Sequence, residues 1–231
     1  MTHPWETLDA ATTSEGRLEL RRRGEREFLI TIAGRVLMNS KASLSELALG
    51  RLACAAIAKR PAPRVLIGGL GMACTLRACL DVLPARARLV VVELNDVVVR
   101  WCREGPLAEL TDHAALDPRV RLRVGDVADA IREAASPGAD RFDAVILDLY
   151  EGPRPVCPRD HPHYGQEALD RAHAALRERG IFALWSEDAN PSFEKHLTRA
   201  GFAVRSECPT HGARRHVVYL GERGERGRSS M

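Results

Sequence analysis

Two successive apolar runs, the first ending in glycines and the second in an acid, constrain the fold of this chain most. The first run, 64–68, leads into Gly69 and Gly71, and the second, 88–92, ends at Glu93. Buried parallel strands give such runs, and glycines let the backbone approach a ligand without interference from a Cβ atom. An acidic side chain at the tip of the second strand can accept hydrogen bonds from both hydroxyls of a ribose. The pair therefore predicts a binding site for an adenosine-containing molecule.

Strands and helices are expected to alternate along the chain from this point. We expect strands over 18–22, 27–32, 65–67, 88–93, 120–124, 142–148, 181–186, 202–207 and 215–220. We expect helices over 43–60, 73–83, 96–104, the stretch ending at 134, 166–178 and 192–200. Alternation requires a parallel sheet with right-handed crossovers. The last two strands are separated only by a turn, so they are expected to form a hairpin that makes the final strand antiparallel.

This ending is typical of the Rossmann-like class I S-adenosylmethionine-dependent methyltransferase fold. The fold class predicted is therefore α/β, with a mostly parallel seven-stranded sheet, an antiparallel last strand and a small N-terminal β-hairpin. We expect residues 1–60 to form the N-terminal hairpin and helix, and 61–221 the catalytic domain that binds S-adenosylmethionine. Residues 222–231 are expected to be a disordered tail.

Composition limits the functions available to the chain. Its 231 residues suit one globular domain with a small appendage, and a net charge of +3 is too weak to imply a nucleic-acid surface. No stretch approaches the roughly 18 apolar residues of a membrane span, and the N-terminus lacks the apolar core of a signal peptide. The six cysteines are expected to be reduced and buried, in a cytoplasmic protein. Cys157, His161 and His163 have the residue types of a metal site, but prolines at 158 and 162 favour a polar loop, and we expect no metal.

Glycines or acidic residues follow four of the expected strands, where ligands of open parallel sheets bind. Gly69 and Gly71 would lie against the methionine part of a donor, and Glu93 would hold its ribose. Asp126, which also has the sequence position of a helix N-cap, would accept the adenine amino hydrogens, and Asp148 would lie nearest the reacting sulfonium. The complete predicted donor site is Gly69, Gly71, Met72, Glu93, Leu94, Gly125, Asp126, Val127 and Asp148.

Residues 17–220 resemble the spermidine synthase family of aminopropyltransferases. The resemblance rests on the order of these segments: Val65-Leu66-Ile67-Gly68-Gly69, Thr75-Leu76-Arg77, Val92-Glu93, Asp117-Pro118-Arg119-Val120, Gly125-Asp126, Asp143-Ala144-Val145-Ile146-Leu147-Asp148, Tyr164 and Gly180-Ile181. It implies that an amine attacks decarboxylated S-adenosylmethionine at the carbon bonded to sulfur and expels methylthioadenosine. In the family, the aspartate that matches Asp148 serves as base or positioning group for that amine. Members are commonly dimers or tetramers, so the resemblance also allows a homodimer here.

Three departures from the family bear on the second substrate. Met72 stands where polyamine-forming members carry an aspartate, and Glu151 is the second acid of a motif that is D-x-x-D in the family. Of a tyrosine-histidine-glutamate run in the family, only Glu46 remains. The predicted catalytic residues are Asp148, Tyr150 and Glu151, and the predicted pocket for the second substrate is Asn39, Ser40, Glu46, Tyr164 and Trp185. We expect the proline-rich loop 152–163 to act as a lid over the site.

Several functions stay open on the sequence alone. The leading hypothesis is an enzyme that cleaves the Cγ–S bond of S-adenosylmethionine or of its decarboxylated form and transfers an aminopropyl or aminocarboxypropyl group to a small molecule. Without an acceptor, S-adenosylmethionine would cyclise to azetidine-2-carboxylate. The carboxylate of S-adenosylmethionine would favour a nearby hydrogen-bond donor such as Arg77, Asn39, Ser40 or Lys41. Methyl transfer to a small molecule is a further alternative, because the fold commonly supports it. A binding protein without activity is the last.

Overall fold

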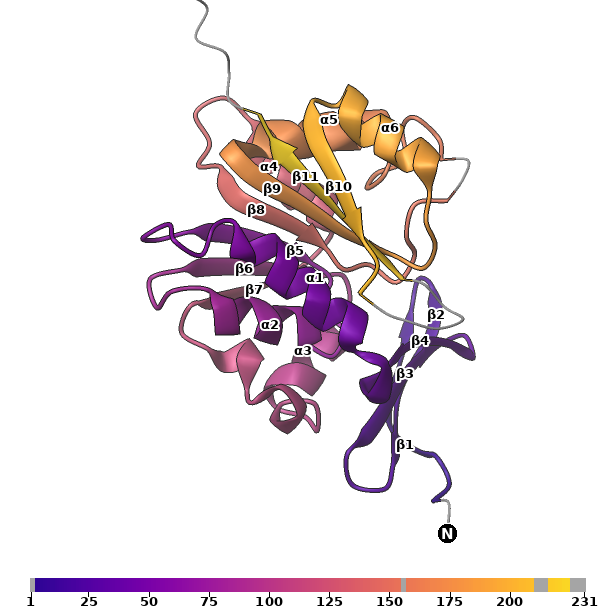
Figure 1. Ribbon diagram of the computed structural model, residues 1–231. Helices are drawn as coiled ribbons and strands as arrows, with labels where there is room; N and C mark the ends of the chain where they lie inside the picture. Colours follow the sequence, from indigo (N-terminus) through magenta and orange to yellow (C-terminus); the bar gives the residue numbers. More distant parts are fainter. Residues whose placement is uncertain (1–2, 155–156, 210–215, 225–231) are drawn as a thin grey trace, which may run out of the picture.

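The computed structural model describes residues 3–154, 157–209 and 216–224, which form two β-sheets with six α-helices (Figure 1). The larger sheet has seven strands in the order β10-β11-β9-β8-β5-β6-β7. Their bounds are Arg64–Gly68 for β5, Arg88–Glu93 for β6, Val120–Val124 for β7, Phe142–Leu147 for β8, Leu176–Ser186 for β9, Phe202–Glu207 for β10 and Val217–Arg223 for β11.

The direction of the strands in this sheet matches the prediction. Strands β5 to β9 pair in parallel with one another. Strand β11 pairs antiparallel with both β9 and β10, because only residues 208–216 separate it from β10 along the chain and it returns between β10 and β9. The expected mostly parallel sheet with an antiparallel last strand is therefore confirmed.

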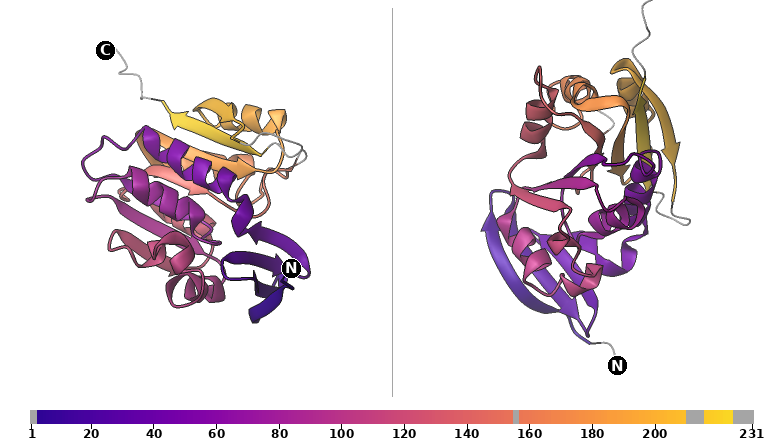
Figure 2. Two further views of the ribbon diagram at one scale, coloured as in Figure 1. Left: turned by 60° about the horizontal axis from the view of Figure 1, so that its bottom comes forward. Right: turned by 90° about the vertical axis from the view of Figure 1, so that its left-hand side faces the viewer.

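Three helices cover each face of the seven-stranded sheet (Figure 2). Helices α1 (Leu44–Ala55), α2 (Cys74–Val82) and α3 (Asp96–Arg103) pack on one face, and α4 (Val127–Ala135), α5 (Gln166–Ala175) and α6 (Pro191–Arg199) on the other. In β5, Val65 and Ile67 point into the first layer and Leu66 into the second, as the alternation of side chains along a strand requires. The carboxyl ends of β5, β6 and β8 thus open between two packed layers.

The N-terminal segment forms a four-stranded antiparallel sheet rather than a hairpin. Its strands are β1 (Glu6–Thr13), β2 (Gly16–Arg23), β3 (Glu27–Ile32) and β4 (Arg35–Asn39), paired in sequence order. The predicted hairpin is its central pair, β2 and β3. The outer strands were not predicted, because neither β1 nor β4 contains a fully buried residue and both lack clear apolar alternation. The apolar face of β2 and β3 packs into the same cluster as helices α1 to α3.

Several boundaries differ from those expected. Helix α1 ends at Ala55 rather than at residue 60. Helix α5 ends at Ala175 and β9 already begins at Leu176, although residues 176–178 favour a helix by propensity. Pairing of Leu176 with Phe142, followed by an irregularity before Ile181 pairs with Ala144, overrides that preference. Strand β11 also runs to Arg223, two residues into the segment assigned to the disordered tail, and Arg223 is buried. Residues 225–231 of that tail, and Arg215 of the last expected strand, lie outside the described residues.

None of the helices in the described part of the chain has the length and apolar character that a bilayer crossing needs. The division of the chain at residue 60 stays a prediction.

Candidate active site

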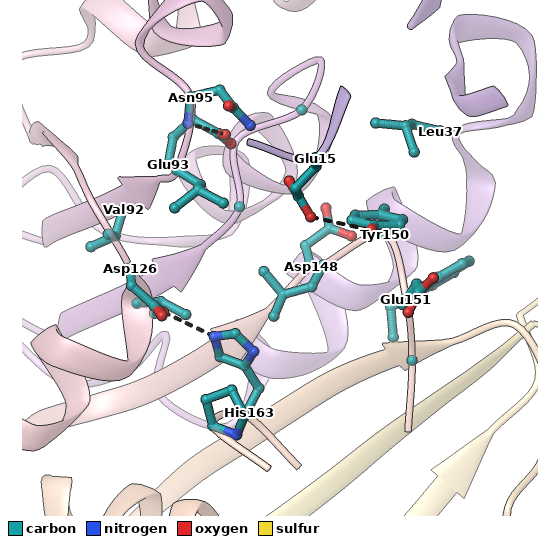
Figure 3. A pocket seen from close by; sticks show the side chains of 18 of the residues that line it. Glu15, Leu37, Val92, Glu93, Asn95, Asp126, Asp148, Tyr150, Glu151 and His163 are labelled. Carbon is teal, nitrogen blue, oxygen red and sulfur yellow. Dashed lines mark hydrogen bonds and ion pairs between the residues drawn. The ribbon is translucent and has the colours of Figure 1, made fainter. Parts of the chain in front are cut away.

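A cavity of about 770 Å³ lies where the carboxyl ends of the parallel strands meet the N-terminal sheet (Figure 3). Its size falls within the range of small-molecule sites, about 300–1,000 Å³. The predicted residues that line it are Glu46, Gly69, Gly71, Glu93, Leu94, Gly125, Asp126, Val127, Asp148, Tyr150, Glu151, Tyr164 and Trp185. The fold therefore brings together side chains that are spread over more than a hundred residues of sequence.

The turn after β5 contains two positions that accept only glycine. Gly69 has φ of +89°, and a Cβ atom there would overlap the carbonyl oxygen of Asp148. Gly71 has φ of +51°, and a Cβ atom there would overlap the sulfur of Met38 from β4. The turn is thus held against both the end of β8 and the N-terminal sheet.

Glu93, at the end of β6, is buried and holds the glycine turn in place. Its Oε2 accepts a hydrogen bond from the backbone N–H of Leu70 at 2.8 Å, and its Oε1 accepts one from Asn95 N–H at 2.9 Å. Burial raises the pKa of Glu93 despite these bonds. The backbone N–H groups of Gly71 and Leu94 also favour its ionised form, so the carboxylate is held by the turn on one side and by the residues after β6 on the other.

Asp126 is the N-cap of helix α4 and also lines the cavity. Its Oδ1 caps helix α4 by accepting from Ala128 N–H at 2.8 Å, and it also lies 2.9 Å from Nε2 of His163. Burial acts against ionisation, but the hydrogen bonds from His163 and Ala128 hold the pKa of Asp126 below its usual value. The other oxygen, Oδ2, accepts no hydrogen bond from the described residues, so it is available to an amino group in the cavity.

Asp148 follows directly after β8, and its environment contains no cationic partner among the described residues. Its Oδ2 accepts from the hydroxyl of Thr75 at 2.6 Å. Burial, followed by the negative charge of Glu46, raises its pKa to about 7, although the Thr75 bond acts in the opposite direction. A carboxyl with a pKa near neutrality exchanges a proton readily at physiological pH, which suits a general base.

The hydroxyl of Thr75 also explains how the proton on Asp148 is accommodated. Thr75 Oγ1 lies 3.1 Å from the backbone carbonyl oxygen of Glu46 as well as 2.6 Å from Asp148. A hydroxyl carries one proton, so Thr75 donates to only one of these acceptors while Asp148 is ionised. When Asp148 is protonated it donates to Thr75, which in turn donates to Glu46, and all partners are satisfied.

Glu46, in the first turn of α1, has its own hydrogen-bond chain. Its Oε2 accepts from the hydroxyl of Ser45 at 2.6 Å, and Ser45 lies 3.0 Å from Nδ1 of His216 on the β11 side. Because the single Ser45 proton goes to Glu46, His216 is the donor to Ser45. The ring of His216 packs edge-on at 5.2 Å from the ring of Trp185, which lines the cavity.

Tyr150 and Glu151 connect the seven-stranded sheet to the N-terminal sheet. The Tyr150 hydroxyl donates to Glu15 at 3.2 Å, and the guanidinium of Arg35 lies 5.3 Å from the centre of the Tyr150 ring. Glu151 forms ion pairs with Arg35 at 3.3 Å and with Arg154 at 2.9 Å. Both side chains therefore already have partners from β4, from the β1–β2 turn or from the adjacent loop.

Some predicted residues lie outside the cavity wall. Met72 is fully buried in the core, and Asn39 and Ser40 stabilise the turn before α1 through bonds from the N–H groups of Lys41 and Phe28. The two cationic residues expected near the carboxylate of S-adenosylmethionine form ion pairs elsewhere: Arg77 pairs with Asp81, and Lys41 pairs with Glu27.

The sequence analysis did not predict the wall that the N-terminal sheet supplies. It consists of Glu15, Leu18, Ile30, Ile32, Leu37 and Met38. The alternating apolar residues of β2 and β3 were a usable signal for one buried face, but nothing local indicates that this face reaches the catalytic sheet. His163 was expected in the polar lid loop and weighed there as a metal ligand, but its contact with Asp126 was not predicted. Among the described residues no cluster of three or more His, Cys, Asp and Glu side chains could hold a metal.

Comparison with known proteins finds a likeness of structure. Neither a protein-family model nor a curated protein sequence matches the chain. A solved spermidine synthase in complex with the transition-state analogue AdoDATO has a TM-score of 0.72 and 17% identity, over 94% of this chain and 72% of that one. The Thermotoga maritima spermidine synthase has a TM-score of 0.72 and 18% identity, over 94% and 73%. A probable spermidine synthase from Corynebacterium glutamicum has a TM-score of 0.67 and 22% identity, over 94% and 79%.

At these identities the likeness establishes the fold. With its mostly parallel seven-stranded sheet and its N-terminal antiparallel sheet, the chain has a spermidine synthase-like fold, as the resemblance of its motifs predicted.

Proposed function

We propose that the protein is an aminopropyltransferase that uses decarboxylated S-adenosylmethionine and releases methylthioadenosine. The observation that carries the proposal is the environment of Asp148: a carboxyl with a pKa of about 7 in a cavity beside a glycine turn, where burial and then the negative charge of Glu46 raise that pKa most. The solved spermidine synthases of similar fold support the same class of reaction.

The charges at the glycine turn favour a donor without a carboxylate. Glu46 and Asp148 line the cavity there, and the cationic or titratable basic groups among the described lining residues are Arg154, His161 and His163 on the loop side. A carboxylate of S-adenosylmethionine placed at the turn would face two acids, and like charges at close range repel strongly where water is excluded. Decarboxylation removes the repelled group and leaves an ammonium that these acids attract.

The donor supplies a sulfonium leaving group, so little chemistry is required of the protein beyond alignment and removal of a proton. The acceptor nitrogen forms a bond to the aminopropyl carbon attached to sulfur, that carbon–sulfur bond breaks, and its electron pair goes to sulfur, which becomes neutral. Asp148 takes the proton that the acceptor nitrogen loses. Alignment of nucleophile, carbon and sulfur can contribute on the order of 7–11 kcal/mol, and proton removal by a positioned base contributes roughly a hundredfold or more in rate.

The test is mass spectrometry of the nucleoside product after incubation with decarboxylated or carboxylated S-adenosylmethionine, each with and without a mixture of primary amines. Methylthioadenosine from the decarboxylated donor plus amines supports the proposal. S-adenosylhomocysteine would identify a methyltransferase instead. Methylthioadenosine with azetidine-2-carboxylate from S-adenosylmethionine alone would identify a cyclase and contradict the charge argument.

A further inference from the structure

We infer that the acceptor is an amine with a single positive charge and an apolar body, rather than a polyamine. The inference rests on the proposed function. Its basis is the distribution of charge around Asp148: apart from Glu93 and Asp126, which belong to the proposed donor site, the described lining is acidic beside the glycine turn and neutral and apolar beyond it (Figure 3).

The two carboxylates beside the glycine turn, Glu46 and Asp148, equal in number the two substrate nitrogens that the reaction brings there. The donor brings the ammonium of its aminopropyl group, and the acceptor brings the nitrogen that attacks. Met72 is buried in the core and offers no charge at the glycine turn. Glu46 and Asp148 are therefore the acids available for these two nitrogens, with Glu46 for the donor and Asp148 for the attacking amine.

Beyond Asp148, the charges are already balanced. Both carboxylate oxygens of Glu151 have an arginine partner, one from Arg35 and one from Arg154. Glu15 accepts the Tyr150 hydroxyl and is exposed on the β1–β2 turn, where water screens its charge. Two acids and two arginines sum to zero there, so a second ammonium at this end of the cavity would gain little.

The wall beside these groups is apolar. Leu37 and Met38 of β4 both line the cavity although they are adjacent in sequence. A bulge makes this possible: Met38 pairs with Ile30 and Val36 pairs with Thr31, so Leu37 is an extra residue in the strand. Leu18, Ile30 and Ile32 complete this wall, and figure 3 places Leu37 on the side of Asp148 away from Glu93 and Asp126.

The test compares amines of equal carbon number, of which one carries a second ammonium group and the other does not. Methylthioadenosine release from decarboxylated S-adenosylmethionine is measured with butylamine against putrescine and with pentylamine against cadaverine. We expect kcat/KM to be at least tenfold higher for the monoamine of each pair. Each added methylene should raise kcat/KM by up to about fourfold, the value of burying one such group.

A variant and its matched control test whether the apolar wall at Leu37 determines the preference for monoamines. Leu37→Glu adds a carboxylate to the apolar wall and should shift the putrescine-to-butylamine ratio by at least tenfold toward putrescine. Val36→Glu adds the same charge at the exposed neighbouring residue, which is 57% exposed and outside the cavity lining, and should leave the ratio unchanged.

The outcomes separate this inference from the proposed function. Release of methylthioadenosine that favours putrescine tenfold over butylamine in the unaltered protein overturns the inference and leaves aminopropyl transfer standing. Failure of every amine to release methylthioadenosine overturns the proposed function, and the inference falls with it. The comparison of amines uses the unaltered chain, so it does not depend on whether either variant folds.

Discussion

Two aspartates near opposite ends of strand β8 have opposite electrostatic surroundings. Asp143, near its start, is 1% exposed and accepts from Arg60, from Arg177 at 3.1 Å and from the backbone N–H of Arg64 at 2.6 Å. Asp148, just beyond its end, accepts from the neutral hydroxyl of Thr75, and the charges that raise its pKa are those of Glu46 and Glu93. The same side chain, at positions five residues apart, is paired with arginines at one end of the strand and has no cationic partner among the described residues at the other.

The contrast follows from where the two ends lie. At the amino end of β8 the sheet is closed by residues with no ligand to bind, and arginines compensate the buried charge, which would otherwise be costly. At the carboxyl end the strands open into the ligand cavity. There a compensating cation would remove the basicity that the proposed reaction needs. Replacing residues at each end should therefore separate stability from activity.

The largest expected effect is on stability. Asp143→Asn should lower the free energy of unfolding by about 3 kcal/mol, because it leaves Arg60 and Arg177 without their buried partner. Denaturant unfolding measures the loss. Asp140→Asn is the matched control: Asp140 also pairs with arginines but is largely exposed, so its loss should stay below about 1 kcal/mol. Equal losses for the two variants would contradict the structural role of Asp143.

The next effect is on turnover. Asp148→Asn should lower kcat by at least about a hundredfold, which is roughly 2.7 kcal/mol in the barrier, because the base is lost. Donor affinity, measured by calorimetry, should be retained. At pH 8 the free energy of unfolding of Asp148→Asn should be no lower than that of the unaltered protein. The reason is that the raised pKa of Asp148 makes its ionised form, which predominates above about pH 7, unfavourable to the folded state. Unchanged turnover would remove Asp148 from the mechanism.

The pH dependence of activity should report the same carboxyl. Below its pKa of about 7, Asp148 is protonated and inactive as a base, so kcat/KM should fall about tenfold per pH unit. Glu46→Gln removes the negative charge that raises this pKa, and the midpoint should move to lower pH. Glu133→Gln, which removes an exposed carboxylate on α4, is the control and should leave the midpoint in place. A midpoint that stays the same in Glu46→Gln would argue against this coupling.

The smallest effect concerns the far end of the donor site. His163→Gln removes the imidazole that holds Asp126 Oδ1, and we expect donor affinity to weaken about fivefold, the value of one hydrogen bond of roughly 1 kcal/mol. Isothermal titration of the donor measures the change, with His196→Gln on α6 as a control outside the cavity wall. If both variants bind equally well, Asp126 does not need His163 to be positioned.

Much of the site could be predicted because strand ends are a local property. The residues that follow β5, β6, β7 and β8 are known once the strands are, and parallel strands bring those ends to one edge. Glu93, Asp126 and Asp148 lie at that edge. The contact of Thr75 with Asp148, by contrast, could not be predicted, because only the packing of α2 brings the Thr75 hydroxyl to 2.6 Å from Asp148. Likewise, Leu37 faces the cavity only because of a bulge that no residue pattern announces.

By itself, the sequence determined the alternation of strands and helices, the antiparallel last strand and the row of glycines and acids at the strand ends, since these depend on residues close together in the chain. Tertiary structure alone decided which charges are compensated. Asp143 and Asp148 look alike in sequence, yet arginines from positions 60 and 177 reach only the first, and Glu46 from α1 reaches only the second. The reason is physical: a pKa depends on burial and on charges within a few ångströms, and the packing of distant segments sets both.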